Sequence, residues 1–190
     1  MSRRISLVLV HHPVVDRSGA VITTAVTNLD LHDMARSSRA YGLEAMYAVH
    51  PVAAQRDLID RVRAHWIDGS GARRIPDRVP AMELLRSVPS LDDVYAAVGP
   101  GRSSVEVWVT SARRLRTSLT FSAARERLDQ PGKPVLLLFG TGWGLAPEVV
   151  EAADVCLEPI KASVPTGFNH LSVRAACAIA FDRLLGERPD

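Results

Sequence analysis

The most constraining feature of the sequence is a set of short apolar runs that alternate with segments of helical pattern. Two runs, ISLVLV at residues 5–10 and VLLLF at 135–139, are apolar at every position but Ser6, which is typical of strands buried on both faces of a sheet. Further strands are expected at residues 45–49, 105–110 and 154–157, and helices at 31–41, 53–66, 121–128, 147–152 and 171–185. This alternation predicts an α/β fold with a mainly parallel sheet and helices on both faces.

The segments between these elements are less clearly patterned. Residues 11–28 contain proline and glycine and are expected to form a loop at the edge of the sheet. Residues 81–86 look helical, whereas 94–98 fit either a helix or a strand. The first long helix is expected to have Asp30 as its N-cap and to stop at Gly42, because glycine tolerates the positive φ of a helix C-terminus.

The composition is that of an ordinary globular protein and predicts one domain covering residues 1–190. With 47% hydrophobic and 23% charged residues the chain can bury a sizeable core, and no apolar run reaches the ~20 residues of a membrane span. The start, MSRRISLVLV, indicates a strand rather than a signal peptide. The two cysteines, Cys156 and Cys177, lie in apolar segments, so we expect core thiols in a reducing cytoplasm and no metal site.

Three glycines at every second position, in FGTGWGL, follow the strand at 135–139 and admit three interpretations. A Rossmann dinucleotide site would use Glu158 to bind ribose, but the spacing is GxGxG, Trp143 lies within the loop, and only 50 residues follow Gly140. The second interpretation is a tight turn without a ligand. The third is a pocket for another cofactor, because open α/β sheets bind ligands at the carboxyl ends of their strands.

A second segment, EPIKASVPTGFNHLSVRAA at residues 158–176, makes the third interpretation specific. FGTGWGL and PIKASVPTGFNHLSVRAACAI resemble the second and third motifs of the SPOUT superfamily of RNA methyltransferases, and TNLDLHDMARSSRAYGL resembles the first. The chain is most similar to the bacterial family of predicted S-adenosylmethionine (SAM)-dependent RNA methyltransferases, some of whose members are fused to a tRNA guanine-N1 methyltransferase. The resemblance implies a C-terminal deep trefoil knot that binds SAM, a homodimer, and RNA as the substrate, with tRNA expected.

The resemblance assigns the cofactor to the two glycine-containing loops. The cofactor-binding residues that it implies are Leu138, Phe139, Gly140, Thr141, Gly142, Trp143, Gly144, Pro159, Ile160, Ala162, Asn169, His170, Leu171 and Ser172. These loops are apolar, carry hydroxyl groups and contain no cation but Lys161. Such a composition suits adenosine and a sulfonium better than a pyrophosphate, which needs donors and cations.

The first motif supplies the catalytic candidates. Arg36 corresponds to the superfamily arginine that faces the methyl donor; a base role is implausible because a guanidinium keeps its proton in proteins. Asp33 is placed to share a helix face with Arg36, and Asp30 lies at the helix start. Either carboxylate is also explained as an N-cap or as a partner of the helix dipole. His11 and His170 are expected near the rim of the site or as ordinary loop residues.

The positive charge of the chain is carried almost entirely by arginine, with 21 arginines, two lysines and a net charge of +2. A GC-rich genome would produce this bias without functional meaning; alternatively, some guanidinium groups bind an RNA backbone. Arg113, Arg114 and Arg116 directly follow the strand at 105–110, where a substrate would approach, and are the first candidates for RNA binding.

The sequence therefore predicts a cytoplasmic, SAM-dependent methyltransferase acting on RNA. The alternative is a non-catalytic RNA-binding or assembly protein that keeps the fold. The closing helix contains SVRAACAIAFDRLL, whose small residues allow close helix approach, and the resemblance implies that it forms a two-fold interface with the helix at 31–41.

Overall fold

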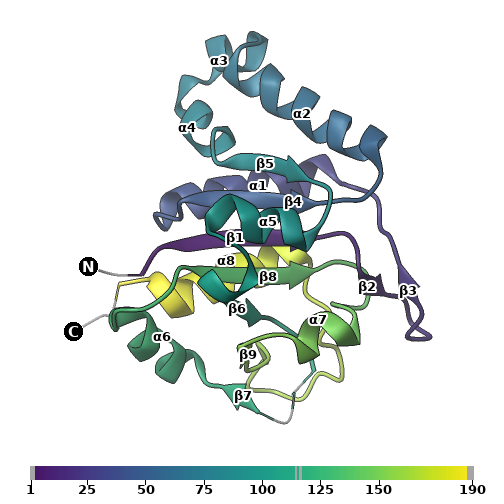
Figure 1. The fold of residues 1–190 in the computed structure, drawn as a ribbon, viewed down its shortest axis with the longest axis vertical. Helices are drawn as coiled ribbons and strands as arrows, with labels where there is room; N and C mark the ends of the chain where they lie inside the picture. The colour runs from purple at the N-terminus through teal and green to yellow at the C-terminus, as the bar shows by residue number, and fades with distance from the viewer. Residues whose placement is uncertain (1–2, 114, 116, 188–190) are drawn as a thin grey trace.

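In a computed structural model, which describes residues 3–113, 115 and 117–187, the chain is built around one parallel sheet (Figure 1). Seven strands pair in the order β5-β4-β1-β8-β6-β9-β7, and every pairing between them is parallel. They are β1 (Ile5–Val10), β4 (Ala45–Val49), β5 (Leu85–Val88), β6 (Glu106–Val109), β7 (Ser118–Leu119), β8 (Val135–Gly140) and β9 (Val155–Leu157). The α/β class and the parallel sheet predicted from the sequence are confirmed.

Helices cover both faces of this sheet, as predicted. One face carries α1 (Asn28–Ala40), α2 (Ala53–Ile67), α4 (Val79–Met82), α6 (Phe121–Asp129) and α8 (Val173–Leu185); the other carries α5 (Leu91–Val98) and α7 (Pro147–Glu151). Successive residues of β8 alternate between the two cores: Leu137 and Phe139 face α1, α6 and α8, whereas Leu136 and Leu138 face α5 and α7. Burial on both faces explains these apolar runs.

Three connections contain structure that the sequence pattern did not reveal. The segment 11–28 includes a hairpin of β2 (Val14–Val15) and β3 (Val21–Ile22), whose turn is closed by the Asp16 carboxylate accepting from the amides of Ser18 and Ala20. Further short helices are α3 (Ser70–Arg74), η1 (Pro76–Arg78) and η2 (Arg102–Ser104). Strands of two residues are too short to show an alternating pattern.

The N-cap predicted for α1 was wrong. Thr27 caps the helix, because its hydroxyl accepts from the amide of Asp30 at 3.4 Å. Asp30 lies inside the first turn, where a carboxylate interacts favourably with the helix dipole. The hydroxyl of a threonine in the extended conformation accepts from a free helix amide as a carboxylate would. The N-cap can therefore lie at Thr27, three residues before Asp30.

The helix predicted at residues 81–86 was also wrong in its second half. The helical turn α4 ends at Met82, and Leu85 begins the edge strand β5, where it pairs with Met46 of β4. Leu85 is fully buried there, and this burial outweighs its good helix propensity. Residues 94–98, left open by their pattern, belong to α5.

The closing helix α8 contacts α1, α6 and β8. Its N-cap is Ser172, whose hydroxyl accepts from the amide of Ala175 at 3.3 Å. Cys177 and Ala180 face the core, whereas Ala175 and Ala178 line a depression on the α1 side. Among the described helices, none combines the length and apolar character needed to cross a membrane.

Candidate functional site

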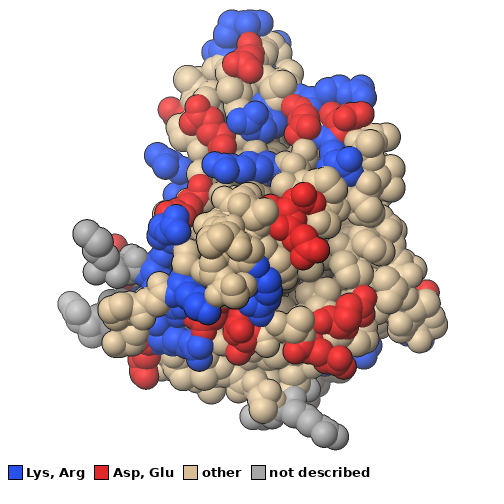
Figure 2. All heavy atoms as spheres, in the orientation of Figure 1, with Lys and Arg blue, Asp and Glu red and all other residues tan. Residues whose placement is uncertain are grey.

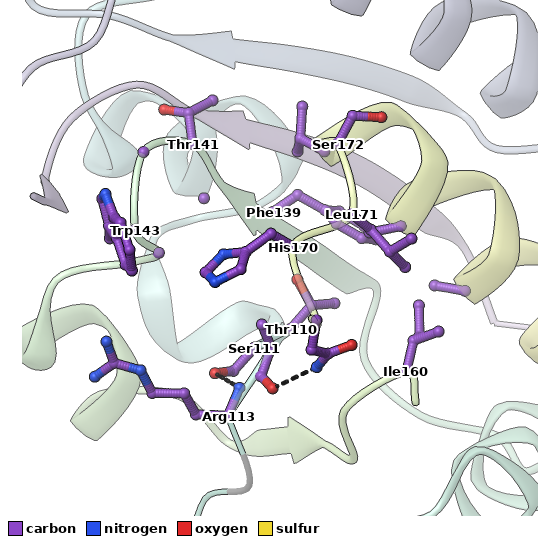
Figure 3. Close-up of a pocket in the computed structure, with 18 of the residues that line it drawn as sticks. Thr110, Ser111, Arg113, Phe139, Thr141, Trp143, Ile160, His170, Leu171 and Ser172 are labelled. Atoms are coloured by element: carbon purple, nitrogen blue, oxygen red, sulfur yellow. Dashed lines mark hydrogen bonds between the residues drawn. The ribbon is translucent and has the colours of Figure 1, made fainter. Parts of the chain in front are cut away.

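The carboxyl ends of β8, β6 and β9 open into a cavity of about 650 Å³ on the α1–α8 side of the sheet (Figure 3). Four segments wall it: residues 140–144 after β8, 110–113 after β6, 158–173 after β9, and 24–30 leading into α1. Parallel strands end at one edge of a sheet, so segments far apart in the sequence meet there. This is the edge at which open α/β sheets bind ligands.

The glycine loop, residues 140–144, is held by backbone hydrogen bonds to the β2–β3 hairpin. The amide of Trp143 donates to the carbonyl of Val15, and the amide of Val15 donates to the carbonyl of Gly144, each at 2.9 Å. The amide of Thr141 donates to the carbonyl of Val10, the last residue of β1. The hairpin that sequence analysis missed therefore fixes the conformation of the loop that it identified.

The glycines of this loop have different roles. A Cβ on Gly140 would lie 2.6 Å from the amide nitrogen of Leu145. Gly142 has φ +59°, and a Cβ there would lie 2.9 Å from the carbonyl oxygen of Val15. Gly144 has φ +115° but open space around it. The glycines thus permit a tight turn, and that turn forms a wall of the cavity, which favours the interpretation as a ligand pocket over a turn without a ligand.

The cavity combines apolar surface with hydroxyl groups and little positive charge. Its larger apolar side chains are Phe121, Phe139, Ile160, Leu171 and Val173, and its hydroxyls belong to Thr24, Thr27, Thr110, Ser111, Thr141 and Ser172. Among the described residues that line it, Arg113 is the one lysine or arginine. A pocket of this kind suits a neutral or cationic nucleoside better than a pyrophosphate.

Two carboxylates contribute to the cavity wall, and both are already hydrogen-bonded. Asp30 accepts from the Thr27 hydroxyl at 2.5 Å and from Arg174 Nη1 at 3.0 Å. Glu158 Oε1 accepts from the amide of Phe121 at 2.9 Å, at the start of α6. Asp30 therefore ties α1 to α8, with its charge compensated by Arg174, whereas Glu158 ties β9 to α6 and adds negative potential to the cavity.

Most residues implied for cofactor binding line this cavity. The exceptions are Leu138, Pro159 and Ala162. Leu138 points into the core under α5 and α7, because its neighbour Phe139 takes the cavity side of β8. Pro159 instead lines a small separate hollow with Lys161 and Arg183. We therefore expect no side-chain contact between these three residues and a ligand in the cavity.

Arg36 and Asp33 lie outside the cavity. They line a shallow depression of about 710 Å³ between α1 and α8, together with Arg174, Ala175 and Ala178. Ser172 borders both the depression and the cavity, so the two hollows are adjacent. Arg174 pairs with Asp33 through Nε at 3.5 Å as well as with Asp30.

Of the predicted RNA-binding cluster, Arg113 is exposed and lines the cavity, with its amide donating to Ser111 Oγ at 3.0 Å. Arg114 and Arg116 lie outside the described residues. Asn169 Nδ2 donates to the carbonyl of Ala112 at 2.9 Å and joins this loop to the segment before α8 (Figure 3).

A buried histidine is connected to the cavity through two hydroxyl groups. The Thr141 hydroxyl donates to the Val10 carbonyl at 3.1 Å and shares a 2.5 Å hydrogen bond with Thr24 Oγ1. His11 Nδ1 lies 3.0 Å from the same Thr24 oxygen. Because Thr141 uses its proton on Val10, Thr24 donates to Thr141, and His11 carries its proton on Nδ1 and donates to Thr24.

We expect His11 to make stability fall below neutral pH. Burial, with a smaller effect of nearby His50, lowers the pKa of His11 from its ordinary value to about 4, although Asp30 opposes this. Between that pKa and about 6.5 the unfolded chain binds a proton that the folded chain does not, so acid favours unfolding. The free energy of unfolding should fall by about 2 kcal/mol between about pH 7 and pH 5 from this group.

Urea unfolding of wild type, His11→Asn and His12→Asn at both pH values measures this contribution. His11→Asn should lose that part of the pH dependence, and His12→Asn should keep it. His50, whose pKa is also lowered by burial, adds a contribution of the same sign to all three proteins. Equal pH dependence in wild type and His11→Asn would contradict a neutral buried His11.

Sequence reasoning missed several residues of the site. Thr24 and Thr27 lay in a segment expected to be a loop, although Thr27 has the residue type of an N-cap. Arg174 stands inside the third motif, and its pairing with Asp30 spans 144 positions, which no local pattern reveals. An arginine in the first turn of a helix, where positive charge is unfavourable, was the available signal.

The fold and the cavity define an α/β protein with a weakly charged, cofactor-sized site at the carboxyl ends of a parallel sheet. Residues 4–186 match the family described as SAM-dependent RNA methyltransferase, and the chain belongs to this family. The family expected from the three motifs is confirmed, and its description names SAM as the cofactor and RNA as the methyl acceptor.

Two relatives differ in how much of their own length this chain covers. A protein named tRNA (guanine-N(1)-)-methyltransferase from Nitratidesulfovibrio vulgaris is 43% identical over 188 residues, which cover 97% of this chain and 43% of the relative. The chain thus spans less than half the length of that relative. An uncharacterized protein from Aquifex aeolicus is 35% identical over 185 residues, which cover 97% of this chain and 89% of that protein.

Solved structures with low sequence identity share the fold. A probable methylase family protein from Haemophilus influenzae superposes with a TM-score of 0.63 at 16% identity, covering 97% of this chain and 66% of that one. A SpoU methyltransferase from Streptomyces viridochromogenes, in complex with AdoMet, gives a TM-score of 0.58 at 15% identity, covering 97% and 58%.

Proposed function

We propose that this chain transfers a methyl group from SAM to RNA, with tRNA as the expected substrate, and that residues 1–190 act as one SPOUT domain. The cavity at the ends of β8, β6 and β9 carries the proposal, because its size and lining fit adenosine and a sulfonium. Arg174 compensates the charge of Asp30, so the carboxylate of Glu158 is what favours a cationic ligand, and the scarcity of lysine and arginine disfavours a pyrophosphate.

The residues that would hold the cofactor are the backbone of the glycine loop, the apolar side chains of Phe139, Ile160 and Leu171, and the hydroxyls of Thr141 and Ser172. When bound, SAM supplies an electrophilic methyl group. The chain itself positions the acceptor in line with that methyl group and excludes water. The hydrogen bond that the Thr141 hydroxyl donates to Val10 and the one that it accepts from Thr24 fix this hydroxyl, so it is oriented before a ligand enters.

We infer that the segment before α8 passes through a deep trefoil knot, as the superfamily resemblance implies. The position of β8 between β1 and β6 supports this inference, since β8 is formed late in the chain. The hydrogen bond from Asn169 to Ala112 also supports it, because it holds the chain that leads into α8 against the loop after β6. A crystal structure traced through residues 158–172 tests the threading.

The substrate assignment rests on the family and on the name of the Nitratidesulfovibrio relative. That name belongs to a protein more than twice as long as the matched region, so we do not transfer guanine-N1 specificity to this chain. The nearly full-length match to the Aquifex protein supports an independent methyltransferase domain. An enzyme with this substrate would act in the cytoplasm, where tRNA is found.

Calorimetry with SAM and NAD, followed by transfer of radiolabelled methyl groups to total RNA, tests the proposal. SAM should bind in the micromolar range and NAD should not, and RNA should acquire label. Binding of NAD without binding of SAM would contradict the proposal. SAM binding without transfer to any RNA would favour the non-catalytic alternative.

We expect Arg113 to govern RNA affinity through a phosphate contact. Arg113→Ala should weaken tRNA binding and reduce the slope of log affinity against log salt by about one, because one fewer counterion is released. Filter binding at several salt concentrations measures the slope, and Arg61→Ala on the exposed side of α2 is the control. An unchanged slope for Arg113→Ala would place the RNA elsewhere.

We expect the α1–α8 face to form a two-fold homodimer interface. The small side chains of Ala175 and Ala178 line the depression there and allow another helix to approach closely. Light scattering at micromolar concentration should give the dimer mass for wild type and the monomer mass for Ala178→Glu, which buries a charge in the interface. Ala54→Glu, at an exposed position of α2, should remain dimeric. A monomeric wild type would refute the interface.

A further inference from the structure

An aromatic rim, formed by Trp143, Phe168 and His170, borders the mouth of the cavity. The His170 ring centroid lies 5.2 Å from that of Trp143 and 5.3 Å from that of Phe168, and it is tilted edge-on to both. Figure 3 shows Trp143 and His170 facing one another from the glycine loop and the segment before α8. Trp143 is 44% exposed and Phe168 is 72% exposed. Among the described residues, no other tryptophan or phenylalanine is exposed to this degree.

Backbone contacts hold these rings toward solvent. Trp143 stands between two glycines of positive φ, and its amide is bound to the carbonyl of Val15. The Thr166 hydroxyl accepts from the amide of Phe168 at 3.2 Å and donates to its carbonyl at 3.1 Å, and Gly167 between them has φ +71°. Exposed aromatic rings on a fixed backbone are unfavourable in water. A group of such rings indicates a surface that binds a ligand or another macromolecule.

Positive charge lies beside the rim. The guanidinium carbon of Arg17, at the tip of the β2–β3 hairpin, lies 5.9 Å from the centre of the Trp143 ring, and Arg113 lines the cavity below. On the face drawn in Figure 2, which carries α5 and α7, basic side chains gather instead toward the amino ends of the strands and over α2. At the mouth of the cavity, positive charge comes from Arg17 and Arg113.

We propose that the aromatic rim stacks an unpaired nucleobase of the RNA substrate, with Arg17 and Arg113 contacting the adjoining phosphates. Aromatic faces beside arginine recognise single-stranded RNA, since every base has a flat π-face and each link carries a negative charge. A base inside a duplex cannot reach a recessed site, so the target must be unpaired or flipped out. The inference rests on the proposed function and adds that the substrate is single-stranded at the site.

The geometry favours a base of the RNA over the adenine of the cofactor as the partner of the rim. Phe168 does not line the cavity, whereas Phe139 and Leu171 offer apolar contact within it. Trp143 lines the cavity, and because it is 44% exposed its ring is also available to a second molecule at the mouth.

Fluorescence anisotropy with a short labelled single-stranded RNA of mixed sequence, and with its abasic counterpart, tests the rim. Trp143→Leu and Phe168→Leu should each weaken binding of the complete RNA about tenfold, the effect of losing one stacking contact. Binding of the abasic RNA should not change. Trp143→Phe, which keeps an aromatic face, and Val164→Ala, which shortens an exposed aliphatic side chain of the same segment, should bind like wild type.

Calorimetry with SAM on the same variants separates this inference from the proposed function. Phe168→Leu, whose side chain lies outside the cavity, should bind SAM within about threefold of wild type, whereas Trp143→Leu reports whether that ring also contacts the cofactor. If both variants bind complete and abasic RNA as wild type does, or if wild type does not prefer the complete RNA, the stacking site is overturned while SAM binding stands. If Trp143→Leu loses SAM and keeps RNA, the ring stacks on the cofactor and the inference is again overturned. Failure of wild type to bind SAM would instead overturn the proposed function.

Discussion

Replacing Gly142 by valine is expected to abolish detectable SAM binding. The glycine has φ +59°, a conformation that β-branched residues avoid, and a Cβ would meet the carbonyl oxygen of Val15 at 2.9 Å. That oxygen accepts from the amide of Trp143, so the loop cannot relieve the contact without losing the hydrogen bond to the hairpin. The loop must shift, and Thr141 moves with it. Calorimetry should show an affinity at least about a hundredfold lower, or ~2.7 kcal/mol.

The matched control is Gly42→Val. Gly42 has a similar φ of +72°, no atom lies within 4 Å of its ideal Cβ, and it follows α1 at the opposite edge of the sheet from the cavity. Both variants should lose on the order of 1–3 kcal/mol of unfolding free energy through backbone strain. The control should nevertheless bind SAM within about threefold of wild type. If Gly142→Val binds SAM normally, the glycine loop does not hold the cofactor.

The sequence was sufficient to predict the centre of the fold because burial there leaves a clear pattern. β1 and β8 are apolar at nearly every position, since their side chains enter cores on both faces of the sheet. The strands at the two edges of the sheet do not show this apolar pattern. In β5 only Leu85 is fully buried, and β7 has two residues, so neither strand carries a periodic signal. The strands of the β2–β3 hairpin are likewise too short to show a periodic pattern.

For the candidate site, the sequence identified the parts whose residues are neighbours in the chain. The glycine loop and the segment before α8 were recognised as motifs, and the structure brings both to one cavity. The contacts between them depend on packing. Arg174 reaches Asp30 because α8 lies against α1, and the hairpin reaches Trp143 because β1 lies beside β8. Neither arrangement can be read from local spacing.

Replacing Arg36 by alanine is expected to lower methylation at least a hundredfold, or ~2.7 kcal/mol in the barrier, while SAM affinity stays within about tenfold. The structure explains why the two effects should separate, because Arg36 is exposed in the depression between α1 and α8 and does not line the cavity. There it is placed to hold an RNA phosphate. Asp30 and Asp33 would then act as positioning residues through Arg174. The control Arg61→Ala on α2 should change neither the methylation rate nor the SAM affinity. Normal methylation by Arg36→Ala would show that the match to the first motif is coincidental.

Mixing the two inactive variants distinguishes between two ways in which Arg36 could act. In a dimer formed through the α1–α8 face, Arg36 of one protomer would lie in the interface and would serve the cavity of its partner. A mixed dimer would then pair the intact cavity of the Arg36→Ala chain with the arginine of the Gly142→Val chain. Random mixing should restore roughly a quarter of the wild-type rate, because half of the dimers are mixed and each has one complete site. If Arg36 serves the cavity of its own chain, neither protomer of the mixed dimer has both elements, and mixing restores nothing.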